Sequence, residues 1–394
     1  MFNINRFALV LFVVTVFFPG CTATRPEKIC GADDLRCLVA EYSNLIARDP
    51  RDLNSYLGRA AALQKSRDLD AAVADCTKAL SIGPKEIRAY RLRGSIYFEQ
   101  RKLVEAIDDF ERLTKLEPDV AENFRLFGEA HQAKGNYDHA LTAINQAIAL
   151  DANNVRSYLA RGRQYRLTRK FDDALSDLFK AIQLEPDYAR SYVERCKLYT
   201  ATKQFDLAMS DCKRSVELLQ PEDAVFTYTA SAGVYAAKGD ISNEIAEYDS
   251  AIKRFPENGQ FYELRGSALL RQNRPDGAKA DFDKAIQLDP NNSSAFSSRG
   301  MSFISMKRYD DAITDLHLAI KLNPKNSDPH GNLGLVYTET GKNDDALTSL
   351  NMALALNPDN TNALKYRAAL FKKNGDSFNA LADTLRLKRL GLAE

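Results

Sequence analysis

Residues 259–292 read GQFYELRGSALLRQNRPDGAKADFDKAIQLDPNN, and the next 34 residues, 293–326, read SSAFSSRGMSFISMKRYDDAITDLHLAIKLNPKN. The two segments share Arg-Gly at their seventh and eighth places, Ala at the twentieth and Pro at the thirty-second. Self-similarity at a fixed period indicates an array of stacked supersecondary units. The sequence therefore predicts a repeat architecture with a 34-residue period.

The same period extends through almost the whole chain, with one two-residue insertion near residue 220. Glycine returns every 34 residues at Gly94, Gly128 and Gly162, and again at Gly266, Gly300 and Gly334. Eight of the 13 prolines share one phase: Pro50, Pro84, Pro118, Pro186, Pro256, Pro290, Pro324 and Pro358. Counting from residue 53, ten units fill the chain: 53–86, 87–120, 121–154, 155–188, 189–224, 225–258, 259–292, 293–326, 327–360 and 361–394.

The recurring text RGxxYxxxxxxxxAIxDFxxAIxLxP resembles the tetratricopeptide repeat. That resemblance implies an all-α, right-handed superhelical solenoid of ten helix-turn-helix repeats. Within the linker 21–52, residues 34–50 are predicted to form an N-terminal capping helix that carries Leu38, Tyr42 and Leu45. The tenth repeat, with many Lys and Arg residues, is predicted to be a solvent-facing C-terminal cap.

The residue types at the repeated places have physical reasons. Gly or Ala at the eighth place, as at Gly94 and Ala232, lets the first helix approach the second closely, and the late Pro ends the second helix. Because Gln220-Pro221 interrupts repeat five and Glu244 replaces the usual Ala, we expect looser packing near 215–245. Arginine at the seventh place is predicted to pack its stem between helices. It occurs at Arg59, Arg93, Arg161, Arg195, Arg265, Arg299 and Arg367.

The first 20 residues are predicted to be a signal peptide. They contain one cation, Arg6, and then an apolar run over residues 7–18, which spans about 18 Å as a helix against a bilayer core of about 30 Å. Gly20-Cys21 at the end of this run resembles a bacterial lipoprotein signal, which predicts lipidation of Cys21. The alternatives are ordinary signal-peptidase cleavage, for instance after Ala23, and an uncleaved anchor.

The other cysteines suggest two disulfides. Export into an oxidising compartment would allow Cys30 to pair with Cys37. Cys196 and Cys212 occupy the eighth and twenty-fourth places of one repeat, on facing helices, so they are predicted to form a bridge or to remain two buried thiols.

Composition and missing motifs argue against catalysis and nucleic-acid binding. With 54 Lys+Arg against 53 Asp+Glu, the net charge of +1 excludes a broadly basic nucleic-acid binder. The chain has no GxSxG, CxxC, P-loop or HExxH motif, and its four histidines lack metal-site spacing. We therefore expect no enzyme activity, no cofactor and no metal.

A binding groove remains, because in the resembling family the first helix of each repeat lines the concave face. In repeats two to five, the inward places hold eight cations against three Glu residues. The eight cations are Arg88, Arg91, Arg125, Arg156, Arg163, Arg166, Arg190 and Lys197. This polarity predicts an extended acidic partner segment, and the alternative is a merely solvated face.

The sequence thus favours a non-enzymatic scaffold that binds proteins or peptides in its groove. The lipoprotein-type signal resembles those of tetratricopeptide lipoproteins of the bacterial envelope, which implies anchoring to a membrane facing the periplasm, with the outer membrane favoured. A soluble periplasmic or secreted protein is the alternative location. The alternative functions are the recognition subunit of a separately encoded envelope transferase or hydrolase, and a structural spacer.

Overall fold

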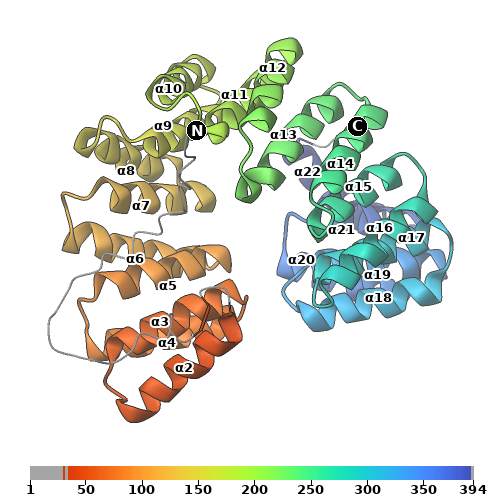
Figure 1. Cartoon of the computed structure of the whole chain (residues 1–394). Helices are drawn as coiled ribbons and strands as arrows, with labels where there is room; N and C mark the ends of the chain where they lie inside the picture. Colours follow the sequence, from red (N-terminus) through yellow and green to blue (C-terminus); the bar gives the residue numbers. More distant parts are fainter. Residues whose placement is uncertain (1–29, 32–33, 392–394) are drawn as a thin grey trace, which may run out of the picture. The chain divides into compact units, whose positions relative to one another are not determined.

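The computed structural model describes residues 30–31 and 34–391, and all regular elements in that part of the chain are helices (Figure 1). The predicted signal peptide and Cys21 lie outside these residues. The chain divides into two compact units, Met1–Ala160 and Arg161–Glu394, which are described separately. Within the described ranges, no helix is both long enough and apolar enough to cross a bilayer.

Each repeat begins with a helix that we call its A helix. The A helices start within one residue of the repeat starts predicted from the 34-residue period. They are α3 (Leu53–Lys65), α5 (Ile87–Glu99), α7 (Ala121–Lys134), α9 (Val155–Leu167), α11 (Ala189–Ala201), α13 (Ala224–Ala237), α15 (Gly259–Arg271), α17 (Ser293–Ser305), α19 (Asp328–Glu339) and α21 (Thr361–Lys373).

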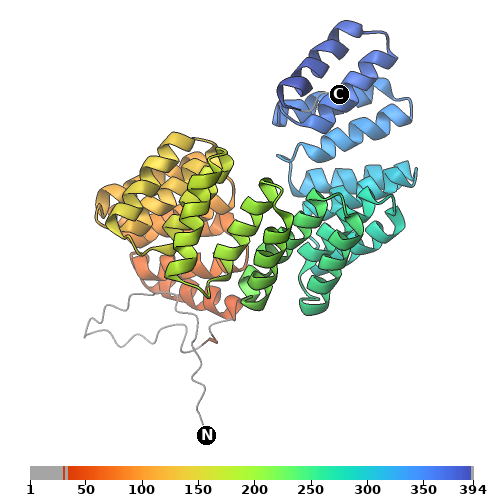
Figure 2. The same ribbon diagram turned by 90° about the horizontal axis from the view of Figure 1, so that it is seen from above.

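The second helix of each repeat, its B helix, packs beside the A helix of the same repeat and, where another repeat follows in the same unit, beside the next A helix (Figure 2). The B helices are α4 (Leu69–Ile82), α6 (Leu103–Leu116), α8 (Tyr137–Leu150), α10 (Phe171–Leu184), α12 (Phe205–Glu217), α14 (Ile241–Arg254), α16 (Pro275–Leu288), α18 (Tyr309–Leu322), α20 (Asn343–Leu356) and α22 (Ser377–Arg389). The predicted all-α solenoid of tetratricopeptide type is confirmed.

The small residue at the eighth place does set the approach of the two helices. A Cβ atom built on Gly94 would lie 2.7 Å from the Phe110 ring, and one built on Gly266 would lie 2.8 Å from the Phe282 ring. Both rings are fully buried. A larger side chain at the eighth place would therefore have to displace a core ring of its own repeat.

The aromatic residue at the fourth place also fixes the loop before its repeat. The hydroxyl of Tyr90 donates a hydrogen bond of 3.0 Å to the carbonyl of Pro84, and Tyr262 does the same to Pro256 at 3.1 Å. The ring packs between helices while its hydroxyl reaches the loop. One side chain thus joins the end of one repeat to the start of the next.

The turn between the A and B helices requires a left-handed residue. Glycine fills this place in four repeats, at Gly135, Gly239, Gly341 and Gly375, with φ between +75° and +85°. In the other six repeats a residue with a side chain adopts the same conformation, with φ between +59° and +67°. These residues are Arg67, Arg101, Arg169, Lys203, Asn273 and Lys307.

Helix α2 (Leu35–Arg48) packs on α3 as the predicted N-terminal capping helix. Leu38 is buried with Cys30 and Ala62. The Tyr42 ring lies where a Cβ on Gly58 would be, so Gly58 lets α2 approach α3 closely. The cap therefore contacts the first repeat as a B helix contacts the following A helix.

The expectation of looser packing near 215–245 is confirmed in part, because α13 and α14 pack less extensively than the A and B helices of the two neighbouring repeats. After α12 the inserted residues form a short 3-10 helix, Pro221–Asp223, and α13 then packs against both α11 and α12. Residues from 219 to 282 share one buried apolar cluster. Glu244, in the place of the usual Ala, is buried and forms an ion pair with Arg271 of the following repeat. This ion pair accommodates the polar residue without opening the core.

The predicted C-terminal cap has an exposed outer face, but this face is less polar than the many Lys and Arg residues suggested. The outer face of α22 is basic only near its end, where Arg386, Lys388 and Arg389 form the last turn. Along the middle of that face, Phe378, Leu381 and Leu385 are exposed. The helix that ends the second unit therefore presents an apolar stripe.

Candidate partner-binding surface on the A helices

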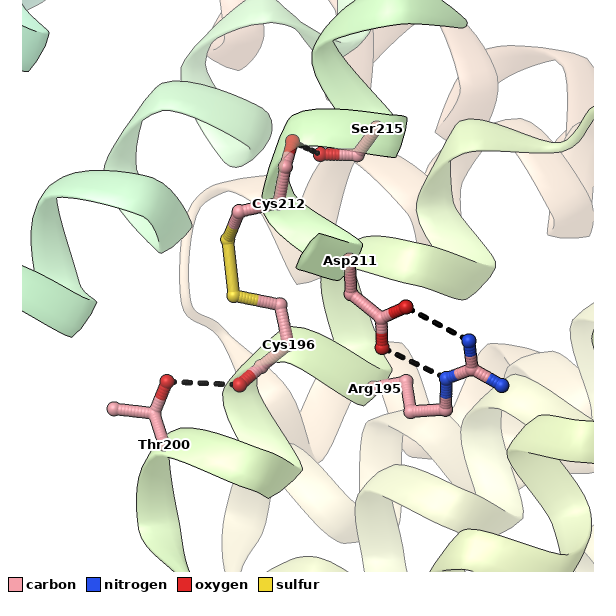
Figure 3. Close-up of a disulfide and its surroundings, with 6 residues drawn as sticks. All are labelled: Arg195, Cys196, Thr200, Asp211, Cys212 and Ser215. Atoms are coloured by element: carbon pink, nitrogen blue, oxygen red, sulfur yellow. Dashed lines mark hydrogen bonds and ion pairs between the residues drawn. A yellow bond between two sulfur atoms is a disulfide. The ribbon is translucent and has the colours of Figure 1, made fainter. Parts of the chain in front are cut away.

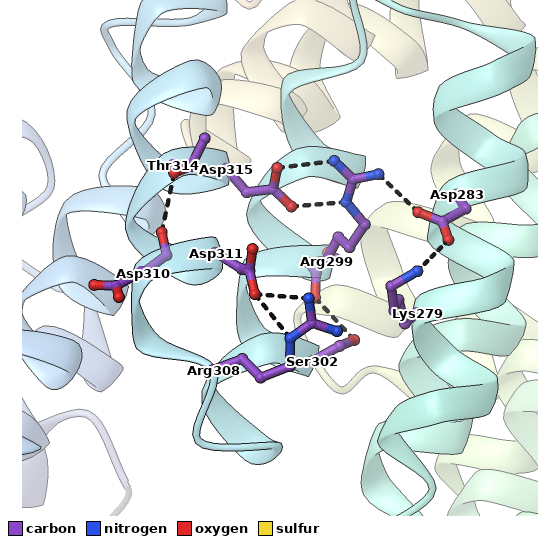
Figure 4. Close-up of polar contacts among 10 residues, drawn as sticks. Lys279, Asp283, Arg299, Ser302, Arg308, Asp310, Asp311, Thr314 and Asp315 are labelled. Carbon is purple, nitrogen blue, oxygen red and sulfur yellow. Dashed lines mark hydrogen bonds and ion pairs between the residues drawn. The ribbon is translucent and has the colours of Figure 1, made fainter.

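The seven arginines at the seventh place serve the fold. Each guanidinium forms a two-pronged ion pair with an Asp sixteen residues later, on the B helix of the same repeat. In repeat eight, Arg299 Nε and Nη2 donate to the two carboxylate oxygens of Asp315 at 2.7 and 2.8 Å (Figure 4). The aspartates are Asp75, Asp109, Asp177, Asp211, Asp281, Asp315 and Asp383.

The same guanidinium often reaches the preceding repeat as well. Arg299 Nη1 donates to Asp283 at 2.7 Å, and Arg367 Nη1 donates to Asn351 at 2.6 Å. Arg299 also lies over the Phe296 ring, 5.4 Å from its centroid. The prediction that these arginines pack between helices is confirmed, and the ion pairs show that they join two B helices to one A helix.

The cations of the first unit are largely occupied by carboxylates of the chain itself. Arg125 is buried between Glu122 and Glu129, with contacts of 2.5 Å to each. Arg91 donates to Glu117 at 3.1 Å, and Arg88 donates to Glu86 and Asn54. Glu117 and Glu86 do not stand at inward places of the repeat, so the sequence-based charge count did not include them. Arg156 is exposed at the start of α9. The charge count of the predicted groove was therefore incomplete in this unit.

The second unit gathers the remaining four cations on the A helices α9 and α11. Arg163 Nε lies 3.5 Å from one oxygen of Glu194, Lys197 Nζ lies 3.3 Å from the same oxygen, and Arg166 Nη2 lies 3.9 Å from the other. Glu194 is only 8% exposed. Burial alone would raise the pKa of Glu194, but Arg163, Lys197 and Arg166 outweigh burial and lower that pKa below its usual value. Glu194 therefore stays ionised, and three cations surround one carboxylate.

An exposed aromatic ring adjoins this cluster. Phe226 on α13 is 52% exposed, and Arg190 and Lys197 lie over its ring at 5.4 and 5.8 Å from the centroid. Arg190 also donates to Asp223 at 2.5 Å, which fixes its guanidinium beside the ring. We call Arg166, Arg190, Glu194, Lys197 and Phe226 the α11 surface.

Two carboxylates at or beside the α11 surface were missed at the sequence level. Glu194 stands at the sixth place of its repeat and Asp223 just before the next repeat, so neither is among the inward places of the family pattern. Phe226 is at an inward place, and its signal was a large apolar side chain where repeats two, four and five carry Arg88, Arg156 and Arg190.

Two disulfides are present in the structure. Cys196 on α11 and Cys212 on α12 are joined with a Cα separation of 5.7 Å, beside the Arg195–Asp211 ion pair (Figure 3). Cys30, just before α2, forms a disulfide with Cys37 in the first turn of α2. Cys76 is an unpaired buried thiol, and burial raises its pKa to about 12. Among the described residues, no three His, Cys, Asp or Glu side chains gather where a metal ion could bind.

Models of the tetratricopeptide repeat match residues 87–120, 125–190, 234–293 and 303–370, together more than half of the chain. The chain belongs to the tetratricopeptide repeat family. No curated protein matches it.

Two solved structures are similar to this tetratricopeptide repeat protein. A chain in the structure of the APC/C hetero-tetramer Cut9-Hcn1 is 14% identical, with a TM-score of 0.45, over 85% of this chain and 82% of that one. YrrB, described as a tetratricopeptide protein with an unusual peptide-binding site, is 23% identical, with a TM-score of 0.36, over 48% of this chain and 97% of its own. At these identities the likeness concerns the fold alone.

Proposed function

We propose that this protein is a non-enzymatic scaffold of the cell envelope that binds protein partners on the α11 surface. The observation that carries the proposal is Phe226, an exposed ring held beside Arg190 and Lys197 on adjacent A helices. Aromatic and arginine side chains dominate the energetics of protein interfaces, and a fixed ring loses little entropy on binding.

The charges of this surface favour an acidic partner segment. Arg166 and Lys197 together exceed the single negative charge of Glu194. A carboxylate of the partner near Lys197, with an apolar side chain against Phe226, would complement both features. The acidic segment expected from the sequence is thus retained for the second unit, where the chain's own carboxylates leave a positive surplus.

The test compares partner recovery from envelope extracts by wild type and by variants of the α11 surface. Phe226→Ser and Lys197→Gln should each reduce recovery several-fold, and added salt should weaken the wild-type interaction because exposed charges are screened beyond about 8 Å at physiological salt. Lys321→Glu, on the exposed side of α18, is the matched control. Equal recovery by all variants, with unchanged helicity, would contradict the proposal.

We further propose that lipid on Cys21 holds the protein at a membrane facing the periplasm, preferably the outer membrane. The support is the short apolar run that ends in Gly20-Cys21. Labelling with a fatty-acid analogue should mark the wild type and should not mark Cys21→Ser. An unlabelled wild type would leave the alternatives of a cleaved soluble protein or an uncleaved anchor.

The alternative functions predict different partner recoveries. A recognition subunit of an envelope enzyme should recover one catalytic protein in a fixed ratio, whereas a scaffold should recover several partners. A structural spacer should recover no partner that depends on Phe226. A recognition subunit would still bind its partner through the α11 surface, whereas a structural spacer would not use this surface.

A further inference from the structure

The last helix of the second unit, α22, carries an apolar stripe on its exposed face. Phe378, Leu381 and Leu385 are 82%, 56% and 47% exposed, and Ala382 is exposed between them. The spacing of three and four residues places them within one narrow arc of α22. The opposite face is buried through Ala380, Asp383 and Leu387.

In the other repeats, the corresponding face of a B helix is where the next A helix packs. Leu347, at the place of Leu381, belongs to the apolar cluster that includes Tyr366 on α21. Asn351, at the place of Leu385, accepts a hydrogen bond from Arg367 on α21. The α22 face therefore has the geometry of a helix-binding surface.

This face is more apolar than its counterparts. At the place of Phe378, seven of the other nine repeats carry Asp: Asp70, Asp138, Asp172, Asp206, Asp276, Asp310 and Asp344. At the place of Leu385, the B helices before α17 and α21 carry Asp283 and Asn351, which accept hydrogen bonds from the arginine of the following A helix. An occupant of the α22 face therefore cannot use the arginine of an ordinary A helix and must supply apolar side chains.

We propose that the occupant is the α22 helix of a second copy of this chain, packed antiparallel about a two-fold axis. With the axis between residues 381 and 382, Phe378 faces Leu385 of the second copy and Leu381 faces the small Ala382. Each large side chain of one helix thus faces either a large apolar side chain or the space left by the small Ala382 of the other. The pattern is complementary to itself, as a two-fold interface requires. The narrow stripe is also the pattern that packs helices side by side.

The charges of α22 favour the same arrangement. Asp376 is at the start of the helix, and Lys388 and Arg389 are at its end, whereas Arg386 is engaged with Asp359. Antiparallel pairing brings Asp376 of each copy close to the basic last turn of the other. A parallel pair would instead place the basic turns side by side, which costs free energy through like-charge repulsion.

The first test is the mass of the purified full chain by sedimentation equilibrium at micromolar concentration. The wild type should show a dimer, and Phe378→Asp should weaken association by roughly tenfold or more. Asp is the usual residue at this place, so the variant should fold. Val104→Asp, at the same place of repeat two and also exposed, at 52%, is the matched control. A monomeric wild type, or a dimer that Phe378→Asp leaves intact, would overturn the proposal.

The second test fixes the direction of the helices. A mixture of Phe378→Cys and Leu385→Cys chains should form a covalent dimer under mild oxidation. Neither variant alone should form a disulfide through its introduced cysteine. The Cα atoms of identical residues would lie about 10 Å apart along the antiparallel pair, beyond the limit of about 7 Å for a disulfide. Efficient bonding of Phe378→Cys chains with each other would show a different arrangement and overturn the antiparallel dimer.

Discussion

At the scale of single residues, the repeated contact is the ion pair between the seventh place and the Asp sixteen residues later. Both groups are largely removed from water, with Arg299 at 21% and Asp315 at 7% side-chain exposure. A pair of this kind contributes little compared with a well-packed apolar pair, but removing one partner leaves an uncompensated charge. Its role is thus best measured by removing both partners together.

Repeat nine supplies the template for that measurement, because it carries Leu333 and Ser349 at these two places. Asp315→Ser should lower the free energy of unfolding by about 2 kcal/mol, since the Arg299 guanidinium loses two charged hydrogen bonds. Arg299→Leu combined with Asp315→Ser should recover a large part of that loss. Urea unfolding of both variants gives the comparison, and a double variant less stable than Asp315→Ser would show that the charges themselves stabilise the repeat.

The sequence contains the signal for these pairs. All seven repeats with arginine at the seventh place have Asp sixteen residues later, whereas the three repeats without it have Ala143, Glu247 and Ser349. The groove charges are different, because they depend on carboxylates outside the repeated places. Glu117, Glu194 and Asp223 meet arginines from other helices, and no periodic rule relates those positions.

At the scale of the helices, the left-handed turn residue offers a reciprocal exchange. Lys307 is exposed, adopts φ of +59° and stands where Gly341 stands in the next repeat. Because a left-handed backbone costs a residue with a Cβ about 1–2 kcal/mol, Lys307→Gly should raise the stability by about 1 kcal/mol and Gly341→Lys should lower it by a similar amount. Thermal unfolding measures both changes, and shifts in the same direction would refute the explanation.

The disulfide between α11 and α12 is the one covalent link that the structure shows inside a repeat. It closes a segment with a sequence separation of 16 residues, which corresponds to about 3 kcal/mol in the chain-entropy model. In a Cys30→Ser/Cys37→Ser variant, reduction of the Cys196–Cys212 disulfide should therefore lower the free energy of unfolding by about 3 kcal/mol, as measured by urea unfolding with and without reductant. A variant that also lacks Cys196 and Cys212 is the control, and its unfolding should not respond to the reductant.

At the scale of the whole molecule, periodicity predicts what is repeated and fails where the chain departs from the repeat. Helix starts followed from the 34-residue period because each repeat obeys the same packing rules. The packing at the junction after α12 did not follow from the period. There α13 contacts both α11 and α12, and these contacts accommodate the two-residue insertion. The apolar face of α22 was also missed, because Phe378 stands at a place where seven of the other nine repeats carry Asp.

Contacts in such an array connect neighbouring repeats, so local damage should stay local. A Cβ on Gly334 in α19 would overlap the Leu350 side chain, and Gly334→Val should therefore destabilise repeat nine by about 1–3 kcal/mol through overpacking. Hydrogen exchange should quicken in α19 and α20 and, more weakly, in the helices next to them. Exchange in α3 to α7 should not change.

Gly233 in α13 provides the control, because a Cβ there would meet no atom within 4 Å. Gly233→Val adds the same side chain to an A helix without displacing a core residue, so exchange in α19 and α20 should remain as in the wild type. Faster exchange throughout the chain in Gly334→Val would mean that the repeats unfold as one cooperative unit. The nearest-neighbour account of this solenoid would then fail, although its helix boundaries would still hold.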